Sequence, residues 1–452
     1  MELEGAKVLV VGMKRSGMAA ASLLTSQKAI VRATDLQTLE ALPEARELLE
    51  RLAIPFETQS PAVFEGCGII VISPDVPADL PVLVAARERG VQVIGDLELA
   101  APLLKGMTIG VTGSNGKTTT TSLIGHILRE SGVDVQVGGN IGTPVSAMVA
   151  NSRRGQWNVL ELSSFQLETI STFRAHVGVA LNVTQNHLDR HHTFEQYAAA
   201  KARLFEMQRA GDTAVLNADD PVCTAFAASG RATVRWFSLL RRFAPGACMG
   251  GEEVLLDGRP LIGIRDIPIR GRHNIQNVMA AAIAASRAGV SREDIGAAVS
   301  TFRAVEHRLE FVRAIEGVDF YNDSKATSVD ATLKALDAFP GGLWVILGGK
   351  DKGLNYTPLR EPLAQKAHAS LLIGAAAGKI ASQLEGAVPL VDSKTLEEAV
   401  AYAWQRAVSG DTILLAPACA SFDQFRGFEH RGETFKELVM GLTPRSSNGP
   451  AA

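Results

Sequence analysis

Short apolar runs alternate with helical stretches along most of the chain. The first such runs are KVLVVG (7–12), followed by a glycine turn and an Ala-rich segment, and IVRATD (30–35). The runs GIIVIS (68–73) and VQVIGD (91–96) continue the alternation. Buried strands that alternate with helices are typical of a doubly wound, mainly parallel α/β sheet. Residues 1–96 are therefore predicted to form a Rossmann-like N-terminal domain.

The second segment, residues 97–304, opens with the strand MTIGVTG (107–113) and a glycine-rich loop. Three further apolar strands, each ending in polar residues, follow it: NVLELSSFQL, VGVALNVTQNH and DTAVLNADD. In open α/β sheets the carboxyl ends of the strands carry the chemistry. An Asp-Gly pair at 257–258 predicts a β-hairpin, and the Ala-rich run NIQNVMAAAIAASRAG predicts the helix that closes this central domain.

The third segment, residues 305–442, alternates again. Its apolar runs are VDFYND, GLWVILGG, ASLLIGAA and DTILLAPA. The last residues, 443–452, are small and polar and contain proline, which predicts a disordered tail. The expected fold is therefore α/β with three domains, the central one a P-loop ATPase domain and the third Rossmann-like.

Composition and charge narrow the functional class. The net charge of -3 does not mark a nucleic-acid binder, and 46% hydrophobic with 21% charged residues is typical of a soluble enzyme. The N-terminus lacks the pattern of a signal peptide, and no apolar run approaches the roughly 20 residues that span a bilayer. The four cysteines form no C-x-x-C pair, so they indicate neither a disulfide framework nor a zinc site. We expect a cytoplasmic monomer without membrane insertion.

The stretch IGVTGSNGKTTTT departs from the common P-loop pattern, which requires a glycine where Val111 stands. Its glycines still let backbone amides turn inward, and the N-terminus of the following helix favours anions. Lys117 can neutralise phosphate and the Thr118 hydroxyl can reach Mg²⁺, whereas a plain glycine turn would not require the Lys-Thr pair. The predicted phosphate-binding residues are Gly113, Ser114, Asn115, Gly116, Lys117, Thr118 and Thr119.

The glycine sequence GMKRSG at 12–17 is a weaker signal. Lys14 replaces the middle glycine of the dinucleotide fingerprint, which disfavours a nicotinamide dehydrogenase. Asp35 lies 18 residues beyond Gly17, where a ribose-binding acid is expected. Nucleotide binding and an ordinary turn both remain open from these residues alone.

Ten motifs then follow in a characteristic order. They are GSNGKTTT, GGNIGTP, ELSSFQLE, NVTQNHLDRH, YAAAK, GRHNIQN, EHRLE, YNDSKAT, GGKDKG and PACASFDQFRGFEHRG. Together they resemble the Mur ligase family over nearly the whole chain. Members join a carboxylate to an amino acid with ATP, through an acyl phosphate. ELSSFQLE is spelled as in the glutamate-adding branch and no D-N-P-R stretch is present, so the resemblance implies D-glutamate and UDP-N-acetylmuramoyl-L-alanine as substrates.

The resemblance also implies how the catalytic residues act. Lys117 binds phosphate, and Glu161 and His187 hold a second Mg²⁺ beside the one at Thr118. Lys201 resembles the lysine that carries a carbamate and helps to hold the second metal. Taken alone, Glu161 could be a helix-capping acid, His187 a structural imidazole and Lys201 a solvated helix lysine.

Further sites follow from the same resemblance. It places other ATP contacts at Asn274, Arg308 and Asp323, and the amino-acid contacts at Lys325, Thr327, Lys352, Ser421 and Phe428. Cations and hydroxyl or amide donors suit the two carboxylates of glutamate. Surface or loop positions with no role in binding are the alternative for these residues.

The first domain is implied to hold the nucleotide sugar. Ser16 and Gly17 would lie near the diphosphate, Asp35 near uridine, and Ser73 and Asn140 along the sugar path. Two spellings depart from the family pattern: Leu36-Gln37 stands where a polar, basic pair is typical, and Asp75 where glycine is common. These differences concern the uracil and sugar contacts and leave the chemistry unchanged.

Two other hypotheses remain. A folate-type polyglutamate ligase would share the loop and the mechanism, but would not need a nucleotide-binding first domain. A nucleotide-gated switch ATPase would need only the loop, and would leave Glu161, His187 and Lys201 without a role.

Overall fold

The computed structural model describes residues 2–303 and 305–445, except for the side chains of residues 188 and 189. The chain forms two compact units. The first contains the residues up to 266 together with 276–301, and the second contains 267–275 and the residues from 302 onward. Most of the predicted tail, residues 446–452, lies outside the described part.

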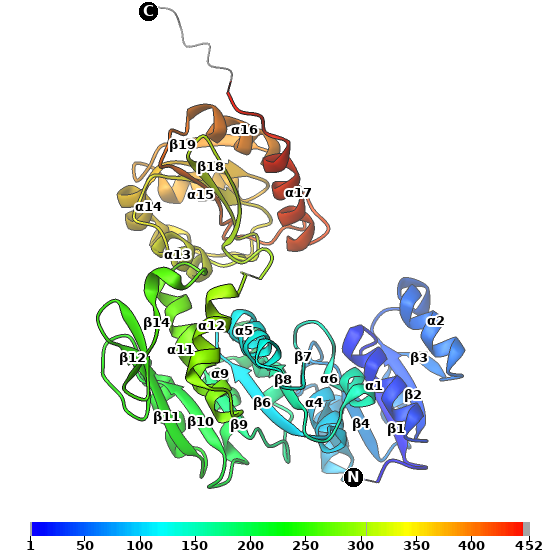
Figure 1. Cartoon of the computed structure of the whole chain (residues 1–452). Helices are drawn as coiled ribbons and strands as arrows, with labels where there is room; N and C mark the ends of the chain where they lie inside the picture. The colour runs from blue at the N-terminus through cyan, green and yellow to red at the C-terminus, as the bar shows by residue number, and fades with distance from the viewer. Residues whose placement is uncertain (1, 304, 446–452) are drawn as a thin grey trace, which may run out of the picture. The chain divides into compact units, whose positions relative to one another are not determined.

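The first unit begins with a five-stranded, fully parallel sheet in the order β3-β2-β1-β4-β5 (Figure 1). Its strands are β1 (Lys7–Val11), β2 (Ile30–Asp35), β3 (Phe56–Thr58), β4 (Ile69–Ile72) and β5 (Gln92–Gly95). Its helices are α1 (Arg15–Ser26), α2 (Pro43–Arg51) and α3 (Pro81–Glu88). The strand order reverses between β1 and β4, and ligands of such sheets bind where this happens.

A nine-stranded sheet follows in the same unit, in the order β14-β13-β12-β11-β10-β9-β6-β8-β7. Its strands are β6 (Met107–Thr112), β7 (Val135–Gly139), β8 (Trp157–Glu161), β9 (Val177–Ala180), β10 (Thr213–Asn217), β11 (Thr233–Ser238), β12 (Gly246–Met249), β13 (Glu253–Leu256) and β14 (Arg259–Gly263). Pairing is parallel from β7 to β12 and antiparallel beyond. The predicted hairpin is confirmed, because Asp257 and Gly258 join β13 to β14 with φ of 50° and 78°, as a type I′ turn requires.

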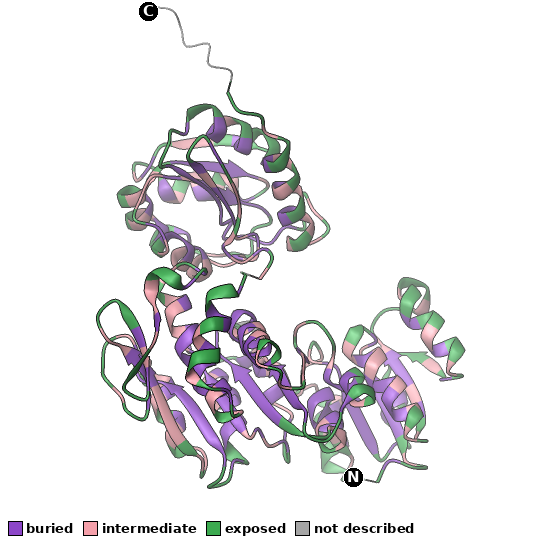
Figure 2. Cartoon of the chain, in the orientation of Figure 1, coloured by how far each residue is buried: buried purple, intermediate pink, exposed green. Residues whose placement is uncertain are grey.

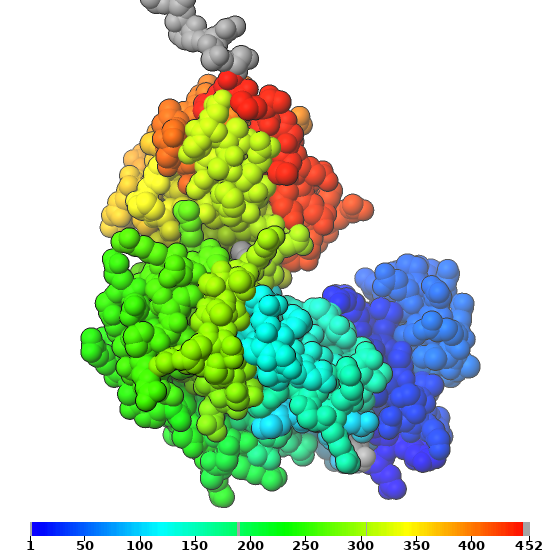
Figure 3. Space-filling view, viewed as in Figure 1, coloured from blue at the N-terminus to red at the C-terminus, as the bar shows by residue number. Residues whose placement is uncertain are grey.

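Helices cover this sheet and connect it to the first one. They are α4 (Asp96–Ala100), α5 (Lys117–Glu130), α6 (Val145–Met148), α7 (Ser164–Leu167), α8 (Leu188–His191), α9 (Phe194–Glu206), α10 (Pro221–Ala225), α11 (Arg272–Arg287) and α12 (Arg292–Thr301). The central strands are buried while the outer helix faces are exposed, as Figure 2 shows. In Figure 3 the blue residues of the first sheet pack against the cyan residues that follow them.

The second unit contains a six-stranded sheet in the order β15-β16-β20-β17-β18-β19. Its strands are β15 (Glu310–Ile315), β16 (Val318–Asn322), β17 (Leu343–Gly348), β18 (Ala367–Ile373), β19 (Leu390–Lys394) and β20 (Thr412–Leu415). Its helices are α13 (Val329–Asp337), α14 (Arg360–Lys366), α15 (Ala377–Leu384), α16 (Leu396–Arg406) and α17 (Phe428–Gly441). Only β15 pairs antiparallel within this sheet of described residues.

Three mainly parallel sheets with helices between their strands confirm the predicted α/β class. The domain boundaries stay predictions. None of the described helices is long and apolar enough to cross a membrane.

Candidate active site

The glycine-rich loop connects β6 to α5. Gly113 and Gly116 have φ of 152° and 83°, values that favour glycine. A Cβ atom at Gly116 would come within 2.5 Å of the Asn277 Oδ1 atom, so a larger residue would also clash there. Val111, where the common pattern has its first glycine, is a buried residue of β6. The departure from that pattern therefore falls in the strand and leaves the loop itself intact.

The segment after β9 fixes the shape of this loop. The amides of Ser114 and Asn115 donate to the backbone and side-chain oxygens of Asn182, over 2.8 and 2.9 Å. The Ser114 hydroxyl donates to the Thr184 carbonyl over 3.0 Å and lies 2.9 Å from the Tyr197 hydroxyl. Asn182, Thr184 and Tyr197 were not assigned roles from the sequence, although they lie in the NVTQNHLDRH and YAAAK motifs.

Lys117 is the first residue of α5 and folds back over the loop. Its Nζ atom donates to the carbonyls of Gly113 and Ser114, over 2.9 and 3.0 Å. The ammonium group is thereby held next to the N-terminus of a helix, where phosphate groups bind favourably. Its position fits the predicted phosphate contact.

Glu161 ends β8 and is 2% exposed. Its Oε2 atom accepts a hydrogen bond from the Thr118 hydroxyl over 2.7 Å, and its Oε1 atom accepts one from Asn140 Nδ2 over 2.8 Å. The helix that follows is capped by Ser163 in a capping box with Gln166, so the alternative role of Glu161 as the capping acid is wrong. The structure brings together two predicted metal ligands, Thr118 and Glu161, and one predicted sugar contact.

Lys201 lies on α9 and is only 1% exposed, so it is not a solvated helix lysine. Its Nζ atom donates to the Gly113 carbonyl over 3.0 Å and lies 4.4 Å from the centre of the Tyr197 ring. Burial, and after it the positive charge of Lys117, hold the pKa of Lys201 well below its usual value. The charged ammonium form is therefore less favourable here than in an exposed lysine.

His187 lies on an exposed segment and has φ of 54°. Its ring contacts Phe165 edge-on at a centroid distance of 5.1 Å, and the Tyr197 ring centre lies 6.3 Å away. Among the side chains that the structure describes, which exclude that of residue 189, no three of His, Cys, Asp or Glu form a group that could hold a metal ion. The metal role of His187 stays a prediction.

Arg190 fixes this segment to the loop that follows β4. Its Nη2 atom donates to the Val76 carbonyl over 2.8 Å and to Glu168 Oε2 over 3.1 Å. His192 in addition lies 3.1 Å from an oxygen of Asp79. Sequence reasoning assigned no role to Arg190, although it lies in the NVTQNHLDRH motif three residues after His187.

A pocket of about 490 Å³ opens at the switch point between β1 and β4. Three predicted sugar-nucleotide residues, Ser16, Ser73 and Asn140, line it. Since Asn140 also binds Glu161, this pocket lies next to the predicted catalytic carboxylate. Gly17 and Asp35 are not part of the lining.

Gly17 and Asp35 instead fix the loop that borders the pocket. A Cβ atom on Gly17 would lie 1.8 Å from the Gly12 carbonyl oxygen, so only glycine allows α1 to approach the loop this closely. The two carboxylate oxygens of Asp35 accept from the amides of Met13 and Gln37, over 2.7 and 2.9 Å. A direct contact of Asp35 with uridine stays a prediction.

In the second unit the predicted amino-acid contacts lie on neighbouring loops. The Nζ atom of Lys325 lies 4.3 Å above the centre of the Phe428 ring. Lys352 Nζ approaches the Thr327 carbonyl at 3.4 Å, and burial lowers the pKa of Lys352. Ser421 is buried, and its carbonyl accepts from the turn that follows it.

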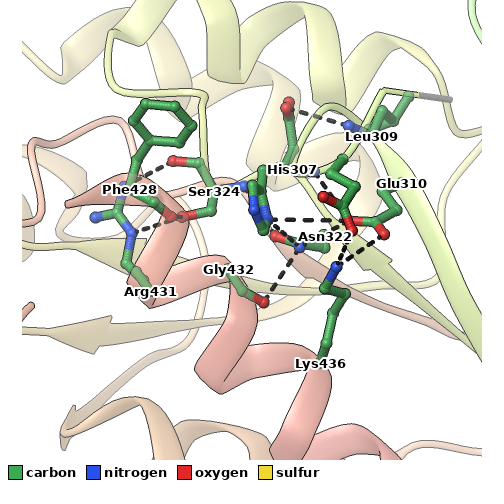
Figure 4. Close-up of polar contacts among 11 residues, drawn as sticks. His307, Leu309, Glu310, Asn322, Ser324, Phe428, Arg431, Gly432 and Lys436 are labelled. Atoms are coloured by element: carbon green, nitrogen blue, oxygen red, sulfur yellow. Dashed lines mark hydrogen bonds and ion pairs between the residues drawn. The ribbon is translucent and has the colours of Figure 1, made fainter. Parts of the chain in front are cut away.

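Arg431 joins these loops and was not assigned a role from the sequence. Its side chain is fully buried and donates to the Ser324 hydroxyl and carbonyl, over 3.0 and 2.7 Å (Figure 4). It also donates to the carbonyls of Cys419 and Ala420, over 3.2 and 3.4 Å. Burial lowers the pKa of its guanidinium to about 10.

The further ATP residues also belong to the second unit. Burial raises the pKa of Asp323 to about 7, while the positive charge of Arg308 acts in the opposite direction. Asp323 Oδ1 accepts from the Leu309 amide over 3.2 Å. Asn274 is buried and donates to the Arg270 carbonyl over 2.6 Å. Arg308 and Asp323 are thus neighbours, whereas the phosphate loop belongs to the first unit.

Family models match three consecutive parts of the chain. The MurD-like N-terminal domain of Mur ligases matches residues 6–95, the Mur ligase middle domain residues 111–285, and the glutamate ligase domain of Mur ligases residues 307–419.

Curated relatives match along the full length. A UDP-N-acetylmuramoylalanine–D-glutamate ligase from Solibacter usitatus (strain Ellin6076) is 69% identical over 98% of this chain and 100% of its own. A relative of the same name from Acidobacterium capsulatum is 50% identical over 97% of both chains.

Two solved structures share the fold. A pseudomurein peptide ligase type C from Methanothermus fervidus has a TM-score of 0.59 at 19% identity, over 97% of this chain and 100% of its own. The UDP-N-acetylmuramate-alanine ligase from Thermotoga maritima has a TM-score of 0.61 at 18% identity, over 96% and 99%. With three family models in order and full-length relatives at 69% and 50% identity, the chain belongs to the Mur ligase family.

Proposed function

We propose that the chain is an ATP-dependent amide ligase that adds D-glutamate to UDP-N-acetylmuramoyl-L-alanine and releases ADP and phosphate. The observation that carries the proposal is the similarity to the UDP-N-acetylmuramoylalanine–D-glutamate ligase of Solibacter usitatus, which is 69% identical over 98% of the chain. Its place would be cytoplasmic peptidoglycan precursor synthesis, and we expect a monomer. The domains proposed for this role are residues 1–96 for the nucleotide sugar, 97–304 for ATP and 305–442 for the amino acid.

The reaction has two steps. First, a carboxylate oxygen of the acceptor attacks the γ-phosphorus of ATP, and the bond from that phosphorus to the bridging oxygen breaks to release ADP. The amine of D-glutamate then attacks the carbonyl carbon of the acyl phosphate, loses a proton and expels phosphate. Because an anion attacks an anion in the first step, cations must surround the reacting centre. Lys117, held over the loop carbonyls, supplies one of these cations.

The residues around the loop fit Mg²⁺. Thr118 and Glu161 present a hydroxyl and a carboxylate 2.7 Å apart, and oxygen donors of this kind are those that Mg²⁺ prefers. Bound Mg²⁺ would neutralise charge that develops on the phosphate oxygens. We assign Thr118 to a first ion, and Glu161, His187 and a carbamate on Lys201 to a second.

Carbamylation of Lys201 is supported by its environment. A neutral amine attacks carbon dioxide, forming a nitrogen–carbon bond and losing a proton, which turns a would-be cation into an anion. Burial lowers the pKa of Lys201, so the reactive neutral form is available at lower pH than for an exposed lysine. The product could bind a metal beside Glu161.

The remaining residues are assigned to substrates. Ser16, Gly17, Asp35, Ser73 and Asn140 serve the nucleotide sugar, and the 490 Å³ pocket supports the assignment of the three that line it, Ser16, Ser73 and Asn140. Asn274, Arg308 and Asp323 complete the ATP site. Lys325, Thr327, Lys352, Ser421 and Phe428 bind D-glutamate, with Arg431 keeping their loops together.

The test is phosphate release with ATP, Mg²⁺ and UDP-N-acetylmuramoyl-L-alanine, with D-glutamate, L-glutamate, L-lysine and diaminopimelate compared and the product identified by mass. Release only with D-glutamate, with a product heavier by one glutamyl residue, is the expected result. A preference for L-glutamate would keep the mechanism and overturn the stereochemistry. Slow ATP hydrolysis that ignores every amino acid would favour the switch ATPase, and use of a folate instead of the nucleotide sugar would favour the polyglutamate ligase.

A further inference from the structure

Lys14 and Asp75 form an ion pair between the two loops that border the switch-point pocket. Lys14 Nζ lies 2.9 Å from Asp75 Oδ2, and both side chains line the pocket. Lys14 lies in the loop after β1, and Asp75 lies in the loop after β4. The pair therefore crosses the crevice in which open α/β sheets bind ligands.

The charged side chains of the pocket lining balance one another. They are Lys14, Arg15, Glu44 and Asp75, two cations and two acids. The guanidinium of Arg15 donates to the Gly142 carbonyl, whereas Lys14 is engaged by a carboxylate. A phosphate group that enters the pocket would be attracted by Lys14 and repelled by Asp75. The two residues therefore have opposite effects on its binding free energy.

The backbone at Asp75 is held independently of the ion pair. Arg190 donates to the carbonyls of Asp75 and Val76, over 3.4 and 2.8 Å, and the Val76 amide donates to the Ser73 carbonyl over 2.9 Å. Separation of the Asp75 carboxylate from Lys14 therefore needs only side-chain rotation. Both side chains are mostly exposed, at 71% and 66%, and ion pairs this exposed are weak.

We propose that Lys14 binds the diphosphate of the nucleotide sugar. The Asp75 carboxylate competes with the diphosphate for Lys14, and it pairs with Lys14 until the diphosphate displaces it. This inference rests on the proposed function, because the diphosphate is that of the UDP-linked substrate. Asp75 thus weakens nucleotide binding and helps to release the product, while Lys14 makes the pocket prefer a nucleoside diphosphate to an uncharged nucleoside.

The test is calorimetric binding of UDP and of uridine to the full chain and to two variants. Asp75→Asn should bind UDP about two- to fivefold more tightly, the range expected when an exposed ion pair is removed. Lys14→Met should bind UDP about tenfold more weakly, through loss of a charge-assisted phosphate contact. Neither variant should change uridine binding, and added salt should reduce the difference between the variants and the original chain.

The chain offers a matched control. Lys28 and Glu4 form another 2.9 Å ion pair with 74% and 70% exposed side chains, and neither lines the pocket. Lys28→Met and Glu4→Gln should leave UDP binding unchanged.

The outcomes separate this inference from the proposed function. If the original chain neither binds UDP nor forms the glutamyl product, both the proposed function and this inference are overturned. If the original chain binds UDP and forms product, the inference alone is overturned by an Asp75→Asn variant that binds UDP no more tightly, or by a Lys14→Met variant that binds it no more weakly. An equal loss for uridine in Lys14→Met would also overturn it, since the effect would not depend on phosphate.

Discussion

The Thr118 hydroxyl, in the first turn of α5, donates a 2.7 Å hydrogen bond to Oε2 of Glu161, the last residue of β8. Strands β6 and β8 are parallel neighbours, with Val111 opposite Glu161. The carboxyl ends of both strands therefore meet at one edge of the sheet. A residue in the first turn of α5 and a residue 43 positions away thus share one polar site.

Replacement of this carboxylate by an amide tests its role as a metal ligand. Glu161→Gln keeps the size of the side chain, and the Thr118 hydroxyl can rotate to accept a hydrogen bond from the new amide. We expect phosphate release to fall about 100-fold or more, a loss typical of a missing electrostatic contact, with the melting temperature nearly unchanged. More than a tenth of the original rate at saturating Mg²⁺ would contradict a role in metal binding.

The buried lysine gives a second prediction. With isotopically labelled bicarbonate, the chain should show one carbamate carbon signal by nuclear magnetic resonance, and Lys201→Met should abolish both this signal and ligase activity. The physical reason is burial, which lowers the pKa of Lys201 and so makes the neutral, nucleophilic amine more available than in an exposed lysine. The exposed Lys28→Met variant is the control and should retain the signal. A signal that persists in Lys201→Met would assign the carbamate elsewhere.

The buried carboxyl group of Asp96 should make the free energy of unfolding depend on pH. It is 2% exposed, its Oδ1 accepts from the amide and hydroxyl of Ser146, and its Oδ2 has no hydrogen-bond partner among the described residues. Burial raises its pKa to about 6. Between the unfolded pKa and this value the folded state binds more protons than the unfolded state, so stability decreases as pH rises through this interval.

The variant Asp96→Asn should remove this contribution. A shift of about 2 pKa units corresponds to on the order of 3 kcal/mol, which the original chain loses between about pH 4 and pH 6. Asp96→Asn should therefore be more stable than the original chain at pH 8, by about 1–3 kcal/mol, with a smaller difference at pH 5. Urea unfolding at pH 5 and pH 8 measures the free energy of unfolding of both proteins. If the variant is less stable than the original chain at pH 8, the buried, charged carboxylate does not destabilise the fold.

Much of the fold follows from local sequence. The strands β1, β2, β6 and β16 lie within the predicted runs, because largely buried strands of a parallel sheet are rich in apolar residues. Edge strands such as β7 (VQVGG) and β15 (EFVRAI) are only partly buried, so their sequences carry little pattern. Neither of these two edge strands was predicted from the sequence.

The site was predictable as a set of residues but not as a set of contacts. The motifs selected Thr118, Glu161 and Lys201, yet only the fold shows that Lys201 is buried and that Ser163 caps α7 in place of Glu161. Arginine is almost always exposed, so a fully buried Arg431 cannot be inferred from its neighbours in the chain. Long-range contacts of this kind depend on packing between distant loops.

Arg431 carries the last prediction. Five guanidinium donors satisfy oxygens on the loops of Ser324, Cys419 and Ala420, whereas a lysine offers three donors from one nitrogen. Arg431→Lys keeps the charge but should free at least one loop that carries the amino-acid contacts. We expect the KM for D-glutamate to rise about tenfold and the KM for the nucleotide sugar to stay within about twofold.

Steady-state kinetics with each substrate varied in turn separates this positioning role from a general loss of stability. Glu437→Gln, at an exposed position on the same helix, is the control and should leave both KM values unchanged. General destabilisation would reduce the amount of active enzyme and lower kcat with all KM values intact. If Arg431→Lys lowers kcat alone, the residue only stabilises the fold. A selective rise in the KM for D-glutamate would instead show that the buried guanidinium positions the loops that carry the amino-acid contacts.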